Sequence, residues 1–125
     1  MTRSFLLIVG LIFIAYGLAC ALDPGLPARV AGLEILTGDG YAELGAMYGG
    51  VQAGVGLFLA LAAFRPRDQG AAVLLVAITM GLVAVTRGAS ALRTDAELTV
   101  YTWGALGFET VVTIIALTLL TRRPG

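Results

Sequence analysis

Two ionisable residues lie inside long apolar stretches of this sequence and are the first candidates for chemistry. Glu109 lies midway along the apolar run 98–120, and Arg87 lies near the end of the preceding run, in VAVTRGAS. A charged side chain within a membrane costs on the order of 3 kcal/mol to insert, so it is expected where it has a partner or a task. Because both side chains are long, we expect Arg87 and Glu109 to form an ion pair between neighbouring helices.

Three further polar residues stand in another apolar stretch, in YAELGAMYGGVQ. They are Glu43, Tyr48 and Gln52. Helical spacing places Tyr48 and Gln52 on one face, at the depths of Arg87 and Glu109, with Glu43 at the outer border. We therefore expect all five residues to form one polar cluster in the outer half of a helical bundle. Two interpretations remain open: a clamp that fixes helix register, or a pocket for a small molecule or lipid headgroup.

Four apolar segments must position these residues. The segments are residues 5–22, 43–64, 71–92 and 98–120. Each is long enough, as a helix, to cross a hydrocarbon core of about 30 Å. At that depth the backbone must satisfy its own hydrogen bonds, which favours helices. The sequence therefore predicts an all-α integral membrane four-helix bundle, a single transmembrane domain over residues 1–125, with an outer loop at 23–42.

Composition supports this class and excludes several others. Hydrophobic residues make up 58% of the chain and charged residues only 13%, whereas a soluble domain is about a quarter charged. The net charge is zero, so a nucleic-acid partner is not expected. There is no histidine and one cysteine, Cys20, and no nucleophile has a base beside it. We expect no catalytic residue, metal site or cofactor, and therefore no enzyme.

Arginine placement predicts the orientation. With four spans, five arginines lie on one side: Arg3, Arg65, Arg67, Arg122 and Arg123. The other side holds two arginines among five acidic residues. Positive charge marks the cytoplasmic side, so both termini are expected in the cytoplasm and the protein in an inner membrane. A rival interpretation remains open, because Ala19-Cys20-Ala21 resembles a signal-peptide cleavage site, and cleavage there would leave three spans.

Small residues form a line along the second and third spans. The line in the second span is Ala42, Ala46, Gly49, Ala53, Gly56, Ala60 and Ala63; that in the third is Gly70, Ala77, Gly81, Ala84, Gly88 and Ala91, with Leu74 as its one large member. A line of Ala and Gly lets a neighbouring helix approach closely in lipid. We expect these seams to pack tightly, with the second and third spans as an antiparallel pair.

The run from Glu43 to Gln52, E-x-x-x-M-Y-G-G-x-Q, followed by Arg87 and Glu109, resembles a known family. It is similar to the small four-span bacterial membrane proteins classed as a domain of unknown function, DUF4345. Members often carry a basic residue where this chain has Gly45, so an ion pair of Glu43 at that point is not carried over. The resemblance implies a four-helix inner-membrane protein and no established activity.

These observations predict a non-enzymatic membrane module that binds a ligand or partner through the outer half of the bundle. The alternative is a small dimeric transporter or channel that uses Glu109 as an intramembrane carboxylate. The expected partners are the lipid bilayer, a second copy or another membrane protein, and a lipid or small-molecule ligand.

Overall fold

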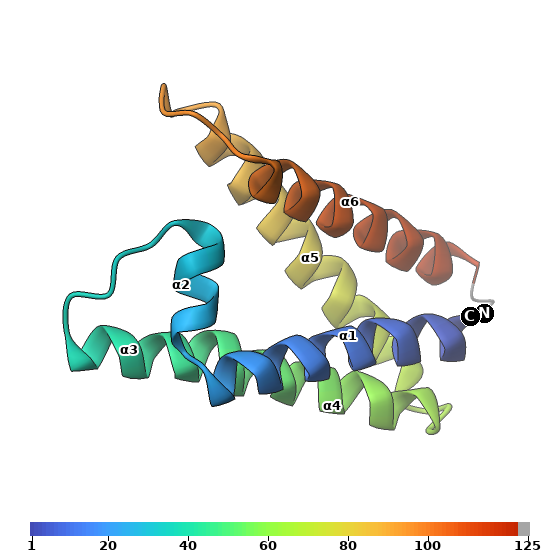
Figure 1. Ribbon diagram of the computed structural model, residues 1–125. Helices are drawn as coiled ribbons and strands as arrows, with labels where there is room; N and C mark the ends of the chain where they lie inside the picture. The colour runs from blue at the N-terminus through green and yellow to red at the C-terminus, as the bar shows by residue number, and fades with distance from the viewer. Residues whose placement is uncertain (123–125) are drawn as a thin grey trace. The chain divides into compact units, whose positions relative to one another are not determined.

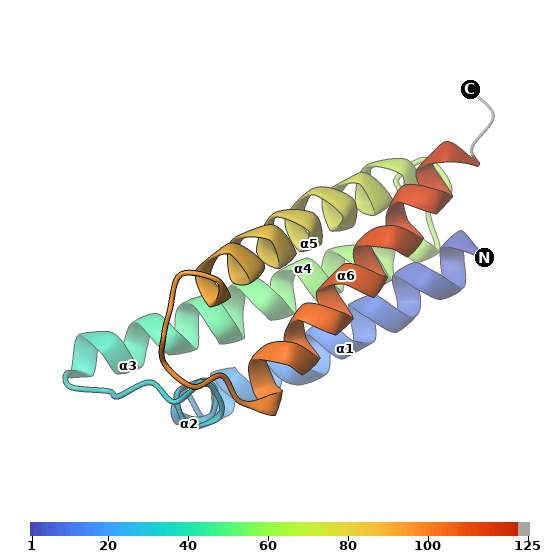
Figure 2. The same ribbon diagram turned by 90° about the horizontal axis from the view of Figure 1, so that it is seen from above.

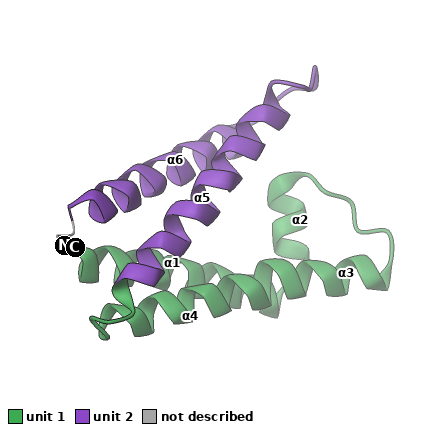
Figure 3. Cartoon of the chain, turned by 180° about the vertical axis from the view of Figure 1, so that it is seen from behind, with its two compact units in different colours: residues 1–69 green, residues 70–125 purple. Residues whose placement is uncertain are grey.

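The computed structural model describes residues 1–122, and all regular secondary structure in that range is helical. Four of its helices are long and apolar enough to cross a membrane: Thr2–Leu22, Gly38–Ala63, Gln69–Ala91 and Val100–Thr121. The chain forms two compact units, residues 1–69 and 70–125, which are coloured separately in Figure 3. Arg123, one of the arginines used to predict orientation, lies outside the described residues.

The first unit pairs α1 (Thr2–Leu22) with one long helix. That helix consists of α3 (Gly38–Leu44), a π-helical segment η1 (Gly45–Val51) and α4 (Gln52–Ala63). Both Figure 1 and Figure 2 show α1 running alongside α4. The guanidinium of Arg3 lies 4.5 Å from the centre of the Phe64 ring, so a cation–π contact joins the start of α1 to the end of α4.

Glycines bring the backbone of α1 into close contact with η1 and α4. A Cβ atom built on Gly56 would lie 2.7 Å from the carbonyl oxygen of Gly10, and one built on Gly49 would lie 2.8 Å from the Cα of Ala21. Gly17 approaches Ala53 in the same way. Small residues of the second span therefore face the first span here. The expected pairing of the second span with the third joins the two units and stays a prediction.

The long second-span helix begins at Gly38 rather than at residue 43. Thr37 caps it: the backbone is extended at this residue, and its Oγ1 accepts a hydrogen bond of 3.1 Å from the amide of Gly40. Such a cap satisfies an amide that has no partner within the first helical turn. The Thr37 cap therefore explains why this helix starts before residue 43.

The π-helical segment η1 contains part of the predicted polar face. A π-helix bonds each amide to the carbonyl five residues earlier and so holds more residues in each turn than an α-helix. Tyr48 lies within η1, and Gln52 is the first residue of α4. Because four residues are close to one full turn in both helix types, the shared face of Tyr48 and Gln52 stays a prediction across this segment.

The loop predicted at residues 23–42 contains a short helix, α2 (Gly25–Ala31), which runs across the direction of α1 (Figures 1 and 2). Asp23 starts it: one carboxylate oxygen accepts from the Gly25 amide at 3.1 Å and the other pairs with Arg29. The bond from Arg29 holds the pKa of Asp23 below its ordinary value of 3.8. Gly32, with φ of 71°, ends the helix in a left-handed conformation that glycine adopts without strain.

The second unit is an antiparallel pair of helices. It contains α5 (Gln69–Ala91), whose first residue belongs to the other unit, and α6 (Val100–Thr121). A Cβ atom built on Gly81 would lie 3.4 Å from Thr113, and one built on Gly88 would lie 3.9 Å from Leu106. Positions later in α5 therefore face positions earlier in α6. These are ordinary van der Waals distances, unlike the closer approach of α1 and α4.

The close approach of α1 and α4 is tested by adding one methyl group. We expect Gly56→Ala to lower the free energy of unfolding by about 1–3 kcal/mol, because the added Cβ meets backbone that must shift. Gly54→Ala is the matched control, since nothing lies within 4 Å of a Cβ there. Thermal unfolding in detergent measures both variants. Equal melting temperatures for the two would contradict this packing.

Candidate ligand-binding site

The strongest polar contact between α5 and α6 joins Arg87 to Glu109. The Nε of Arg87 lies 3.0 and 2.9 Å from the two carboxylate oxygens, and its Nη2 lies 2.7 Å from Oε1. One edge of the guanidinium therefore faces the carboxylate directly, the geometry of the strongest charge-assisted hydrogen bonds. The ion pair predicted from the sequence is confirmed.

The two partners differ in burial. The side chain of Glu109 is 8% exposed and that of Arg87 is 27% exposed. The Tyr101 ring lies beside the guanidinium, with its centre 5.9 Å from Cζ, and Thr113 donates to the backbone carbonyl of Glu109 at 2.7 Å. Arg87 stands about one turn before the end of α5. It therefore lies between the buried carboxylate of Glu109 and the exposed linker that follows the helix.

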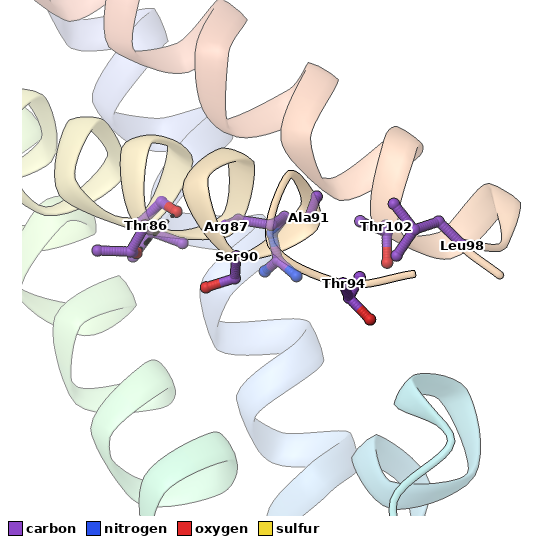
Figure 4. A pocket seen from close by; sticks show the side chains of 8 residues that line it. Thr86, Arg87, Ser90, Ala91, Thr94, Leu98 and Thr102 are labelled. Carbon is purple, nitrogen blue, oxygen red and sulfur yellow. Dashed lines mark hydrogen bonds between the residues drawn. The ribbon is translucent and has the colours of Figure 1, made fainter. Parts of the chain in front are cut away.

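A cavity of about 540 Å³ opens beside Arg87, within the second unit. Its lining comes from the last turns of α5, the linker and the start of α6: Val83, Thr86, Arg87, Ser90, Ala91, Thr94, Leu98 and Thr102. Figure 4 shows the Arg87 guanidinium and the Ser90 side chain on the same side of α5. The lining thus combines one cationic group and four hydroxyls with apolar side chains.

The hydroxyls of this cavity are not equally engaged. Thr86 donates to the carbonyl of Leu82 at 2.8 Å, and Thr94 accepts from the amide of Ala96 at 3.1 Å. Within residues 1–122, the Ser90 and Thr102 hydroxyls have no hydrogen-bond partner. Serine and threonine inside apolar helices commonly bond their own backbone, as Thr110, Thr113 and Thr118 do here. The Ser90 and Thr102 hydroxyls are therefore free to bind another molecule.

The other three predicted site residues lie in the first unit. Glu43 is exposed at the end of α3, while Tyr48 and Gln52 are half-buried. Glu43 lines a separate cavity of about 480 Å³ with residues 33–37 and the start of α3. The structure thus brings Arg87 and Glu109 together, and the gathering of all five residues into one cluster stays a prediction.

Ser90 and Thr94 were missed in the sequence, although their spacing contains a signal. Val83, Arg87 and Ser90 follow one another at intervals of four and three, which places them on one stripe of α5, and Thr94 continues this spacing in the linker beyond the end of the helix. Thr102 shares a face with Glu109 by the same argument. What the sequence does not supply is the course of the linker, which places Thr94 and Leu98 in the lining of the open cavity.

The Glu109 carboxylate accepts bonds from Arg87 on both oxygens, so it is not free to act as a general base. Within the part of the chain that the structure describes, no three His, Cys, Asp or Glu side chains are grouped so as to hold a metal ion. Cys20 is buried as a free thiol in α1, which suits a small packing residue.

Four apolar helices of spanning length, with an ion pair between two of them, define a multi-pass helical membrane protein. A family model described as a domain of unknown function (DUF4345) matches residues 1–120, and the chain belongs to that family. This confirms the resemblance seen in the sequence. Comparison with curated proteins and with solved structures finds no match.

The ion pair is tested by removing its partners singly and together. We expect Arg87→Met to lower the free energy of unfolding by about 3 kcal/mol, because it leaves the Glu109 charge without a partner in an apolar setting. Glu109→Gln is expected to be milder, since the amide still accepts a hydrogen bond. The double variant Arg87→Met/Glu109→Met is expected to recover stability, because neither charge remains.

Thermal unfolding in detergent measures these variants, with Arg93→Met as the control. Arg93 is exposed in the linker, and no ion pair within the described residues involves it. A double variant that melts below Arg87→Met would contradict a stabilising pair.

Proposed function

We propose that this protein is a non-enzymatic module of the bacterial inner membrane that binds a ligand through the cavity beside Arg87. The observation that carries the proposal is the set of free polar groups in that cavity. Two unpartnered hydroxyls and an oriented guanidinium line one space, next to apolar side chains. Ligand pockets commonly have this composition, with a few polar groups that orient the ligand and apolar walls that hold it.

The proposed orientation has both termini in the cytoplasm, which puts the linker 92–99 and the cavity on the outer side. It is supported by the arginines at positions 3, 65, 67 and 122, against the acidic residues of the outer segments. Large exposed apolar side chains lie on every span, for example Leu11, Leu57, Leu82 and Ile114. They suit contact with lipid, a second copy or another membrane protein.

A dimeric transporter or channel that uses Glu109 as an intramembrane carboxylate is the alternative. It would require Glu109 to separate from Arg87 during each cycle, and the three short distances between them oppose this. Uptake of substrate or protons into proteoliposomes distinguishes the two, since a binding module gives none.

The orientation is tested with a reporter enzyme that is active only in the periplasm. Fused after Gly125, it is expected to give no activity, because the C-terminus is proposed to lie in the cytoplasm. The same reporter fused after Asp95, in the linker, is the positive control and is expected to be active. Activity at Gly125 together with silence at Asp95 would reverse the orientation.

The binding function is tested by filling the cavity. Ala91 lines it, so Ala91→Phe is expected to exclude the ligand and to remove bound small molecules from the protein purified in mild detergent. Native mass spectrometry detects these molecules as added mass. Ala71→Phe is the matched control, because Ala71 is exposed in α5 and does not line the cavity. Identical bound masses in the wild type and both variants would contradict the proposal.

A further inference from the structure

The polar wall of the cavity is made of donors. A guanidinium carries five N–H groups, and Glu109 engages Nε and Nη2, which leaves N–H groups on the outer end of Arg87. The free hydroxyls of Ser90 and Thr102 add two more donors. No carboxylate lines the cavity. A ligand that presents several acceptor oxygens close together therefore fits this wall better than one that presents donors.

The charge of the site limits the ligand to an anion with a single negative charge. Arg87 is already paired with Glu109, so the pair has no net charge, and the linker residues Arg93, Asp95 and Glu97 together add a net charge of −1. A doubly charged phosphate would be repelled by the carboxylate behind the guanidinium. A singly charged group with two or more free oxygens avoids most of this repulsion and still forms charge-assisted hydrogen bonds with Arg87. A phosphodiester has this charge and these oxygens.

The place of the cavity along α5 fits an amphiphile. α5 has 23 residues, or about 34 Å of helix, against a hydrocarbon core of about 30 Å. Arg87 is one turn, about 6 Å, from the end of α5, close to the boundary between the acyl chains and the headgroups. Val83 and Leu98 give the cavity apolar walls on which an acyl chain or glycerol backbone can lie.

We propose that the ligand carries a phosphodiester group bound by Arg87, Ser90 and Thr102, with its apolar part against Val83 and Leu98. The inference rests on the proposed binding function and names the chemical class of its ligand. The phosphodiester can belong to a phospholipid headgroup or to a soluble molecule. In either case Glu109 acts as a positioning residue, which fixes the guanidinium but does not touch the ligand.

The test compares one lipid with and without its phosphate. Native mass spectrometry in mild detergent measures the binding of dioleoylphosphatidylglycerol and of dioleoylglycerol. We expect the phospholipid to bind the wild type about tenfold more tightly, from two or three hydrogen bonds. The double variant Ser90→Ala/Thr102→Val is expected to bind the phospholipid about tenfold more weakly and dioleoylglycerol unchanged. It leaves the ion pair intact, and its melting temperature checks its folding.

The control variant is Ser4→Ala/Thr118→Val, which removes the same two hydroxyl types at positions that do not line the cavity. Glycerophosphoglycerol, the same headgroup without acyl chains, identifies the source of the phosphodiester: displacement of the lipid by it supports a soluble ligand, and failure to displace supports a lipid.

Equal affinity for dioleoylglycerol and the phospholipid, both lost in Ala91→Phe, would overturn the phosphodiester but keep the binding function. Binding that Ala91→Phe does not change would overturn both, and an unchanged phospholipid affinity in the Ser90→Ala/Thr102→Val variant would overturn the inference.

Discussion

The hydrocarbon interior of a membrane offers no water to a charged side chain, and the second unit depends on how that constraint is met. Glu109 is buried, and three short hydrogen bonds from Arg87 on the neighbouring helix lower the free-energy cost of its charge there. Glycines face α6 only at ordinary contact distances, so the ion pair is the directional interaction that holds α5 and α6 in register. The same pair orients the guanidinium at the cavity.

The first unit relies on shape rather than on charge. Between α1 and α4, glycines on both helices let the backbones meet at distances that no Cβ would tolerate. Lipid tails are as apolar as the side chains, so the hydrophobic effect does not drive helices together in a membrane, and such close packing is a main source of helix association. The two units thus use two different solutions to the same problem, van der Waals contact in one and a buried ion pair in the other.

The two units also differ in how they present polar groups. In the second unit, the hydroxyls of Ser90 and Thr102 line a cavity together with the Arg87 guanidinium, which Glu109 orients. In the first, a π-helical turn at Gly45–Val51 contains Tyr48 and ends directly before Gln52. Such turns interrupt α-helices frequently at functional sites. The proposed binding site is accordingly built from the second unit alone, on contacts within one helix pair.

Much of the architecture follows from the sequence alone, because it depends on local properties. Apolar length determines the four spans, and the cost of an isolated charge in lipid predicts the contact between Arg87 and Glu109. Other features depend on contacts that no local pattern encodes. Only the tertiary structure places the second span's glycines against α1 and turns residues 45–51 into a π-helix. It also decides that the linker and the two helices line one open cavity, because a pocket is made by the path of the backbone between helices, which hydrophobic periodicity does not specify.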